Sequence, residues 1–177
     1  MAAEAWWWWA HAADGACGLF VGLELRGDRF DYRAGVVRRG EPLVYIEELD
    51  GTGRRAGLEL KPAEMWADHV CDVPMRQWSL GMEGHGVQVD DLGAALARPF
   101  GTRVPVTLDV EWYATGRPVE AAAGYEQAGE IDAQVELTEG VLSVVGHGGR
   151  LHVWGAVPTA REVLTRAGFL PPTVAGR

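Results

Sequence analysis

Cysteine, basic residues and long apolar runs are all scarce in this chain of 177 residues. Two cysteines, Cys17 and Cys71, are too few for a disulfide framework, and we interpret both as reduced thiols. No apolar stretch approaches the roughly 20 residues that a membrane-spanning helix needs. The run Trp6–Trp9 lacks the basic and long apolar regions of a secretory signal. These absences predict a cytoplasmic protein that does not bind membranes.

Positive charge is low as well, because 16 Lys and Arg face 25 Asp and Glu and leave a net charge of −9. Such a chain does not attract phosphate groups, so nucleic acid and anionic lipid surfaces are not expected partners. An apolar content of 47% with 23% charged residues is ordinary for a globular protein, and this length suffices for one buried core. We therefore expect one domain over residues 1–177.

Short apolar or alternating segments, separated by Gly, Pro and Asp, dominate the chain and predict an all-β barrel. Helical periodicity is nearly absent before residue 90, and residues 91–96 then predict one short helical turn that Pro99 ends. The predicted strands are Ala5–Ala12, Gly18–Arg26, Phe30–Val37, Leu43–Glu48, Gly57–Lys61, Met65–Cys71, Trp78–Glu83, Gly86–Asp90, Val104–Tyr113, Glu130–Leu137, Val141–Val145 and Leu151–Trp154.

A C-terminal helix follows over about 159–168, after a barrel over about 4–157. Thr159 and Glu162 form a capping box, in which each side chain accepts a backbone N–H at the start of the helix. Gly168 stands where a C-cap residue is expected, and the residues from Leu170 onward are expected to fray. The apolar stripe of the helix consists of Val163, Leu164 and Ala167.

The first strand is apolar on both faces, which is unusual for a barrel strand in water. Side chains alternate between faces along a strand, so Trp6 and Trp8 share one face while Trp7, Trp9 and His11 share the other. Two interpretations remain open. A terminal helix or a loop covers the outer tryptophans, or a second copy of the chain does so in a two-fold homodimer.

The segment Gly146–Gly155 contains Arg-x-His-x-Trp-Gly, which resembles a signature of the AttH-like and carotenoid 1,2-hydratase (hydroxyneurosporene synthase) family. That family is built from two lipocalin-like barrels, and this chain is similar to a single, shortened one. Leu151 stands where the signature has aspartate, so the resemblance predicts the fold more than the hydratase reaction. Further similar stretches are Trp6–His11, Glu59–Lys61, Met65–Cys71, Asp109–Trp112 and Gly124–Gln127.

Three titratable residues are candidate catalytic groups. The resemblance implies substrate protonation by His152, with cation stabilisation by Trp154; the alternative is a hydrogen-bonded structural histidine. Glu111 shares a strand face with Asp109 and is a general acid or base if that face points inward, whereas outward it is only solvated. Strand alternation favours the outward interpretation, because Val110 and Trp112 share the apolar face. His11 is the third candidate.

Aromatic residues are numerous enough to line a pocket for a small apolar ligand, or else to fill the core. No segment supplies the three or four ligands of a zinc site, since His69 with Cys71 and His147 with His152 offer two each, and no cofactor is expected. The predicted pocket residues are Trp6, Trp8, Tyr32, Trp66, Trp78, Trp112, Tyr125 and Trp154.

The sequence therefore predicts an all-β, lipocalin-like (calycin-type) antiparallel barrel with a C-terminal helix, and it leaves three functions open. The first is a cofactor-free enzyme that cyclises, isomerises, hydrates or dehydrates a hydrophobic polyketide-like or terpenoid-like molecule. The second is a non-catalytic carrier of an apolar metabolite. The third is a degenerate barrel subunit that partners a full-length relative, which would require a filled barrel and exposed Trp7 and Trp9.

Overall fold

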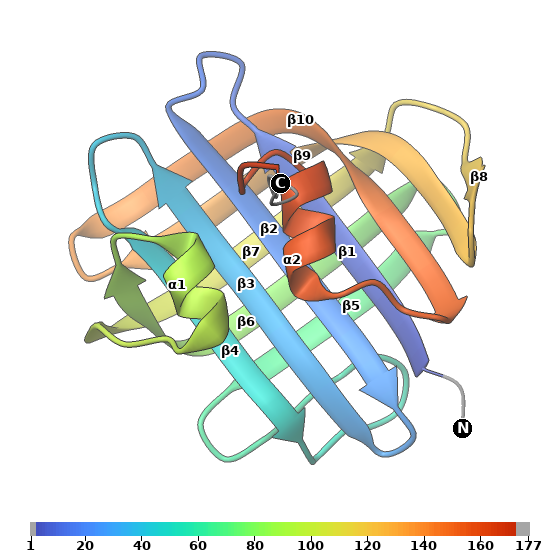
Figure 1. Cartoon of the computed structure of the whole chain (residues 1–177), viewed down its shortest axis with the longest axis horizontal. Helices are drawn as coiled ribbons and strands as arrows, with labels where there is room; N and C mark the ends of the chain where they lie inside the picture. The colour runs from blue at the N-terminus through green and yellow to red at the C-terminus, as the bar shows by residue number, and fades with distance from the viewer. Residues whose placement is uncertain (1–2, 173–177) are drawn as a thin grey trace, which may run out of the picture.

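A computed structural model of the chain describes residues 3–172. Its antiparallel strands form a closed ring (Figure 1), with two short helices on the outside. The elements are β1 Ala3–His11, β2 Cys17–Arg26, β3 Arg29–Arg38, β4 Leu43–Gly51, β5 Trp66–Val73, β6 Gln77–Val89, α1 Leu92–Ala97, β7 Thr102–Ala114, β8 Val119–Ala121, β9 Gly124–Leu137, β10 Gly140–Gly155 and α2 Ala160–Arg166.

The ring closes through β1, which pairs with β2 on one side and with β10 on the other. From β2 the order continues through β3, β4, β6, β7 and β9, and β9 pairs with β10. Strand β5 pairs with the first half of β6, whereas β4 pairs only with its last residues. The predicted all-β, barrel-like antiparallel fold with a C-terminal helix is confirmed.

Several predicted boundaries differ from the structure. The strand predicted over Gly57–Lys61 is wrong, because only Leu60 forms isolated bridges there. The strands predicted on either side of residues 84–85 and of residues 146–150 are continuous in β6 and β10. In β10 the glycines permit close packing rather than a turn, since a Cβ at Gly148 would lie 2.1 Å from the carbonyl oxygen of Trp9. Strand β8 was not predicted.

The interior of the ring is packed with apolar side chains. Trp6 and Trp8 of β1 belong to this core, as do the alternate residues from Val104 to Trp112 of β7. The predicted alternation of β7 is thus confirmed, and its Asp109 and Glu111 point outward. Trp8 and Trp112 are fully buried, so they occupy the space that an internal cavity would need.

Helix α2 lies over the outer face of the sheet beside β1 and β2 (Figure 1), where Trp7 and Trp9 point. Trp7 and Trp9 are 4% and 8% exposed and pack in a second apolar cluster with Val163 and Leu164 of α2. Leu170, predicted to belong to a frayed tail, is buried in this cluster too, while residues 173–177 lie outside the described part. Of the two interpretations of the outer tryptophans, cover by a terminal helix is therefore the one that the structure shows. The homodimer itself remains an untested prediction.

Glycines opposite large rings let the outer cluster close. Trp7 on β1 lies opposite Gly22 on β2, and a Cβ on Gly22 would lie 2.6 Å from the indole ring. Phe20 lies opposite Gly35 on β3 in the same way, with a distance of 2.3 Å. Each ring therefore lies flat across the neighbouring strand, where only a glycine leaves room for it.

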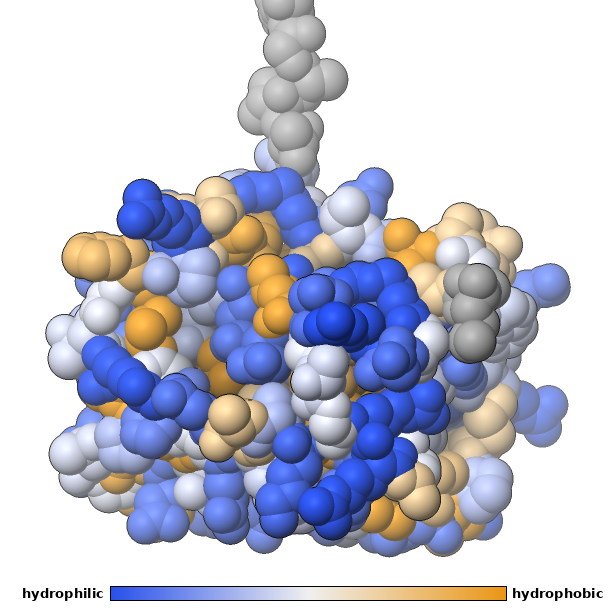
Figure 2. All heavy atoms as spheres, turned by 90° about the horizontal axis from the view of Figure 1, so that it is seen from below, coloured by the Kyte–Doolittle hydropathy of each residue, from blue (hydrophilic) through white to orange (hydrophobic). Residues whose placement is uncertain are grey.

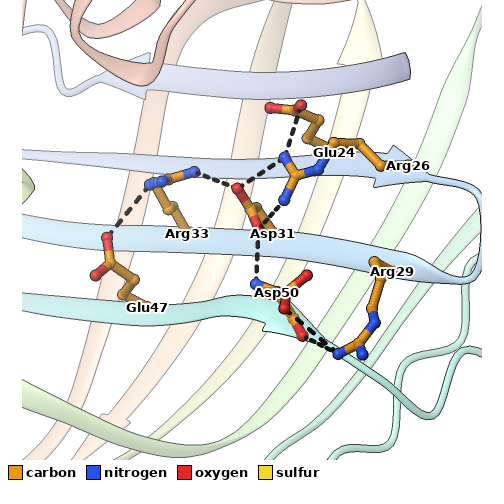
Figure 3. A network of polar contacts seen from close by, with 7 residues as sticks. All are labelled: Glu24, Arg26, Arg29, Asp31, Arg33, Glu47 and Asp50. Atoms are coloured by element: carbon orange, nitrogen blue, oxygen red, sulfur yellow. Dashed lines mark hydrogen bonds and ion pairs between the residues drawn. The ribbon is translucent and has the colours of Figure 1, made fainter. Parts of the chain in front are cut away.

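The remaining outer face of β2, β3 and β4 is polar and carries a connected ion-pair network (Figure 3). Asp31 is its centre, because it accepts bonds from the Arg26 guanidinium and from the backbone N–H of Asp50. Burial acts to raise the pKa of Asp31, but these bonds hold it below its ordinary value. The network consists of Glu24, Arg26, Arg29, Asp31, Arg33, Glu47 and Asp50.

The outer surface shows no large apolar area in the view of Figure 2, where hydrophobic residues form small patches separated by hydrophilic ones. Within residues 3–172, neither α1 nor α2 has the length and apolarity needed to cross a membrane.

The ring–glycine contact predicts a specific cost for Gly22→Ala. The added methyl group overpacks against Trp7, and such overpacking typically costs about 1–3 kcal/mol of unfolding free energy. Gly116→Ala is the matched control, because its nearest neighbour would be the Ala128 methyl group at an ordinary 3.4 Å. Urea unfolding of the three proteins measures both effects. Equal loss of stability in the two variants would contradict this packing.

Candidate functional site

The candidate site lies at one end of the ring, where β1, β10 and β9 run side by side. Their register places Trp6 opposite His152, and His152 opposite Tyr125. Two residues earlier on β10, Arg150 lies opposite Trp8 of β1 on one side and opposite Gln127 of β9 on the other. Side chains two residues apart share a face, so both rows point to the inside of the ring.

His152 is held by a hydrogen bond on each ring nitrogen. Its Nε2 lies 2.8 Å from Oε1 of Glu4, and its Nδ1 lies 3.1 Å from the hydroxyl of Tyr125. The ring stacks on Trp6 at 4.8 Å, and Trp154 meets it edge-on at 5.3 Å. Burial lowers the pKa of His152 below its ordinary value despite the neighbouring Glu4, so the imidazole is neutral at pH 7.

These contacts define one direction of hydrogen bonding. A carboxylate only accepts, so Nε2 of His152 donates to Glu4 and Nδ1 accepts from the hydroxyl of Tyr125. The Tyr125 oxygen in turn accepts a 2.6 Å bond from Nη2 of Arg150. We name the series Glu4, His152, Tyr125 and Arg150 the polar chain; it runs from a half-exposed carboxylate to a buried cation.

Arg150 is the deepest member of the polar chain and is only 1% exposed. Its guanidinium carbon lies 5.3 Å, 5.4 Å and 5.1 Å from the ring centres of Trp78, Trp112 and Tyr125. Burial lowers the pKa of Arg150 below its ordinary value, yet arginine remains protonated in proteins. A positive charge therefore lies among the rings of Trp78, Trp112 and Tyr125, which we call the aromatic box.

Gln127 forms hydrogen bonds to two loops at this end of the ring. Its Nε2 donates at 2.9 Å to the carbonyl of Met75, in the β5–β6 turn, and at 2.9 Å to that of Gly116, between β7 and β8. Met75 has a φ of +61°, which is strained for a residue with a side chain. Its sulfur lies 3.8 Å from Nη2 of Arg150.

His69 on β5 extends the polar interior beyond the polar chain. It stacks on Trp8 at 5.5 Å and is 4% exposed, and burial lowers its pKa to about 4. Its Nε2 has no hydrogen-bond partner among the described residues. The structure therefore holds this histidine neutral in the core.

Two of the three candidate catalytic residues lie away from the polar chain. His11 is on the outer face, where Nε2 lies 2.7 Å from the carbonyl oxygen of Ala167 at the end of α2 and the ring stacks on Phe169. Glu111 points outward from β7 and accepts from Ser79 at 2.8 Å. The outward interpretation of Glu111 is thus the one that the structure shows, and only His152 lies at the ring end.

The predicted pocket residues also divide. Trp66 lies on the outer side of β5, since its neighbour Ala67 is in the core, and it donates to Glu59 at 3.2 Å. The predicted pocket residues line none of the best-formed hollows in residues 3–172, and the hollow that reaches interior side chains does so at Ile46 and Met65 instead. The others meet at the ring end (Trp6, Tyr125 and Trp154) or fill the core beside it (Trp8, Tyr32, Trp78 and Trp112).

Four residues of the site were not among the predicted ones: Glu4, His69, Gln127 and Arg150. Arg150 had a signal, because it lies two residues before His152 on the same strand and so shares its face. Within the described part, no group of three or more His, Cys, Asp or Glu side chains is placed to hold a metal ion.

Comparison of the chain with protein-family models, curated proteins and solved structures finds no match.

The ion pair in the polar chain predicts the response of His152 to Glu4→Gln. The carboxylate of Glu4 raises the pKa of His152 against the effect of burial, so its loss lowers that pKa further. Titration of the histidine ring protons by NMR measures the shift. Glu130→Gln, which changes the carboxylate 3.8 Å from the exposed His147, is the control that leaves His152 unaltered. A raised or unchanged pKa in Glu4→Gln would contradict the contact.

The buried neutral His69 predicts a loss of stability in acid. Its pKa is about 4 in the folded protein and about 6.5 when unfolded, so the unfolded state binds the proton more readily between these values. The contribution of the neutral His69 to the free energy of unfolding is fully present above pH 6.5, and about 3 kcal/mol of it is lost as the pH drops to 4. His69→Phe should lack this loss, whereas His85→Phe, at an exposed histidine of β6, should retain it. Urea unfolding between pH 7 and 4 tests the difference.

Proposed function

We propose that this protein is a cofactor-free enzyme that moves a proton within a hydrophobic small molecule, and that the reaction takes place at the ring end. The observation that supports this most strongly is the polar chain, in which a neutral His152 is poised between Glu4 and the hydroxyl of Tyr125. Such a base with an orienting carboxylate is the arrangement that general acid–base catalysis requires.

The direction of the hydrogen bonds favours proton abstraction through Tyr125. As the Tyr125 oxygen takes a proton from a substrate carbon, its own proton passes to Nδ1 of His152, and Glu4 stabilises the resulting imidazolium at Nε2. The electron pair of the broken C–H bond stays on the substrate as a carbanion, and the positive charge of Arg150, which is bonded to the Tyr125 oxygen at 2.6 Å, offsets it. The reverse transfer at another carbon returns the proton, so no proton is gained or lost, and the net reaction is an isomerisation.

The aromatic surroundings suit an apolar substrate. Trp154 is 51% exposed beside His152, and Tyr125 meets Trp154 edge-on at 6.5 Å. An apolar molecule can therefore lie on Trp154 with a carbon near the Tyr125 hydroxyl, at the mouth of the ring rather than in an internal cavity. Two further features support a lipocalin-like, single-barrel relative of the AttH-like and carotenoid hydratase family: the closed ring and the position of the His-x-Trp pair on its last strand.

Native mass spectrometry of the freshly purified protein tests the proposal first, because it reports the subunit count and any retained small molecule together. We expect a discrete hydrophobic molecule to be released. Incubated with fresh protein in D₂O, that molecule should gain deuterium at carbon with wild type and at least 100-fold more slowly with Tyr125→Phe.

Tyr113→Phe, at an exposed tyrosine of β7, is the control and should exchange deuterium like wild type. A molecule that is retained but takes up no deuterium would make the protein a carrier instead. A protein without any retained molecule and without exchange into added hydrophobic ketones or hydrophobic carboxylic acids would refute the proposal.

A further inference from the structure

The guanidinium of Arg150 is a buried positive charge without a negative partner. It is 1% exposed, and no Asp or Glu within residues 3–172 forms an ion pair with it. Its hydrogen bonds go to the Tyr125 hydroxyl and, weakly, to the sulfur of Met75. Removing a charge from water is costly unless an opposite charge compensates it, so this site has a strong residual preference for an anion.

A hydrogen-bond donor of the guanidinium itself is unpaired as well. The Nε–H of Arg150 and the indole N–H groups of Trp78 and Trp112 are buried, and none has a protein partner in the described part. The guanidinium carbon lies over the faces of the two indole rings, 5.3 Å and 5.4 Å from their centres, so of these donors it is the Nε–H of Arg150 itself that is placed for an anion at this site. A buried donor without a partner is destabilising, so an occupant with an acceptor oxygen at Nε would be stabilised there.

Met75 is an exposed residue in contact with Arg150. It is 38% exposed, and its sulfur lies 3.8 Å from Nη2 of the guanidinium. A thioether is a weak acceptor on a flexible side chain, and a carboxylate is a far stronger acceptor for a guanidinium. The positive φ of Met75 adds strain to the closed turn, which lowers the cost of moving it.

We propose that Arg150 binds the carboxylate of a hydrophobic acid, which displaces the side chain of Met75 from the guanidinium. This inference rests on the proposed function and gives it a substrate class. The carboxylate lies against Arg150 where Met75 was, and the apolar body extends past Tyr125 to the exposed Trp154 at the mouth of the ring. That placement brings the carbons next to the carboxyl group close to the Tyr125 hydroxyl, where the proton is removed.

The test compares an acid with its alcohol on wild type and on Arg150→Met, which removes the charge but keeps a long side chain. Binding of sodium decanoate, 1-decanol and sodium acetate is followed by NMR of the arginine Nε–H groups and by tryptophan fluorescence. We expect decanoate to shift the Arg150 Nε–H signal of wild type, and Arg150→Met to bind decanoate at least tenfold more weakly. The affinity for decanol should change less than twofold.

Arg103→Met, at an exposed arginine of β7, is the matched control and should bind decanoate like wild type. If Arg150→Met does not fold, the Nε–H signals of wild type decide the question alone. Equal binding of acid and alcohol without a shift of the Arg150 signal would overturn the carboxylate assignment and leave the proton-transfer proposal standing. Acetate that shifts the signal as strongly as decanoate would also overturn it, because the site would then accept a small free anion.

The deuterium experiment with Tyr125→Phe uses the molecule that the protein itself retains, so its result is independent of decanoate. A retained molecule that exchanges deuterium but carries no carboxyl group would likewise overturn the role of Arg150 as a carboxylate site.

Discussion

Both faces of strand β1 carry tryptophans that must be removed from water, and the ring interior and helix α2 bury one face each. Trp6 and Trp8 are buried inside the ring, and Trp7 and Trp9 are buried beneath α2. Burying one large apolar side chain contributes on the order of 2–3 kcal/mol, so four adjacent tryptophans are a major part of the stability of a small domain. Because α2 comes from the other end of the sequence, the first and last elements stabilise each other directly.

Much of this fold could be predicted from local patterns, and the failures have a common cause. The alternation from Val104 to Trp112 and the capping box of Thr159 with Glu162 each depend on residues close in sequence, and both were predicted correctly. Glycine misled the prediction at Gly57 and at Gly146–Gly149. A glycine is equally compatible with a turn and with close packing against a neighbouring strand, and only the tertiary structure distinguishes the two.

The candidate site shows a second limit of sequence reasoning. Side-chain alternation predicts that Glu111 and Trp112 lie on opposite faces of their strand. Which of the two faces points to the interior is determined only when the strands close into a ring. The partners of His152 depend on the register between distant strands, because Glu4 and Tyr125 come from β1 and β9. Of the polar chain, the sequence could therefore single out His152 as a catalytic candidate, Tyr125 as a pocket residue and, by its spacing, Arg150. It could not predict that the four side chains form one connected series.

Arg150 connects the stability of the ring to its chemistry. Aromatic faces stabilise a desolvated cation by about 2 kcal/mol or more, yet they do not neutralise it as a carboxylate would. The positive charge thus remains available to a ligand, inside a protein whose net charge of −9 repels anions at a distance. An anionic ligand would consequently gain its affinity from direct contact at the ring end, where burial shields the interaction from salt, and from the apolar surface that it buries there.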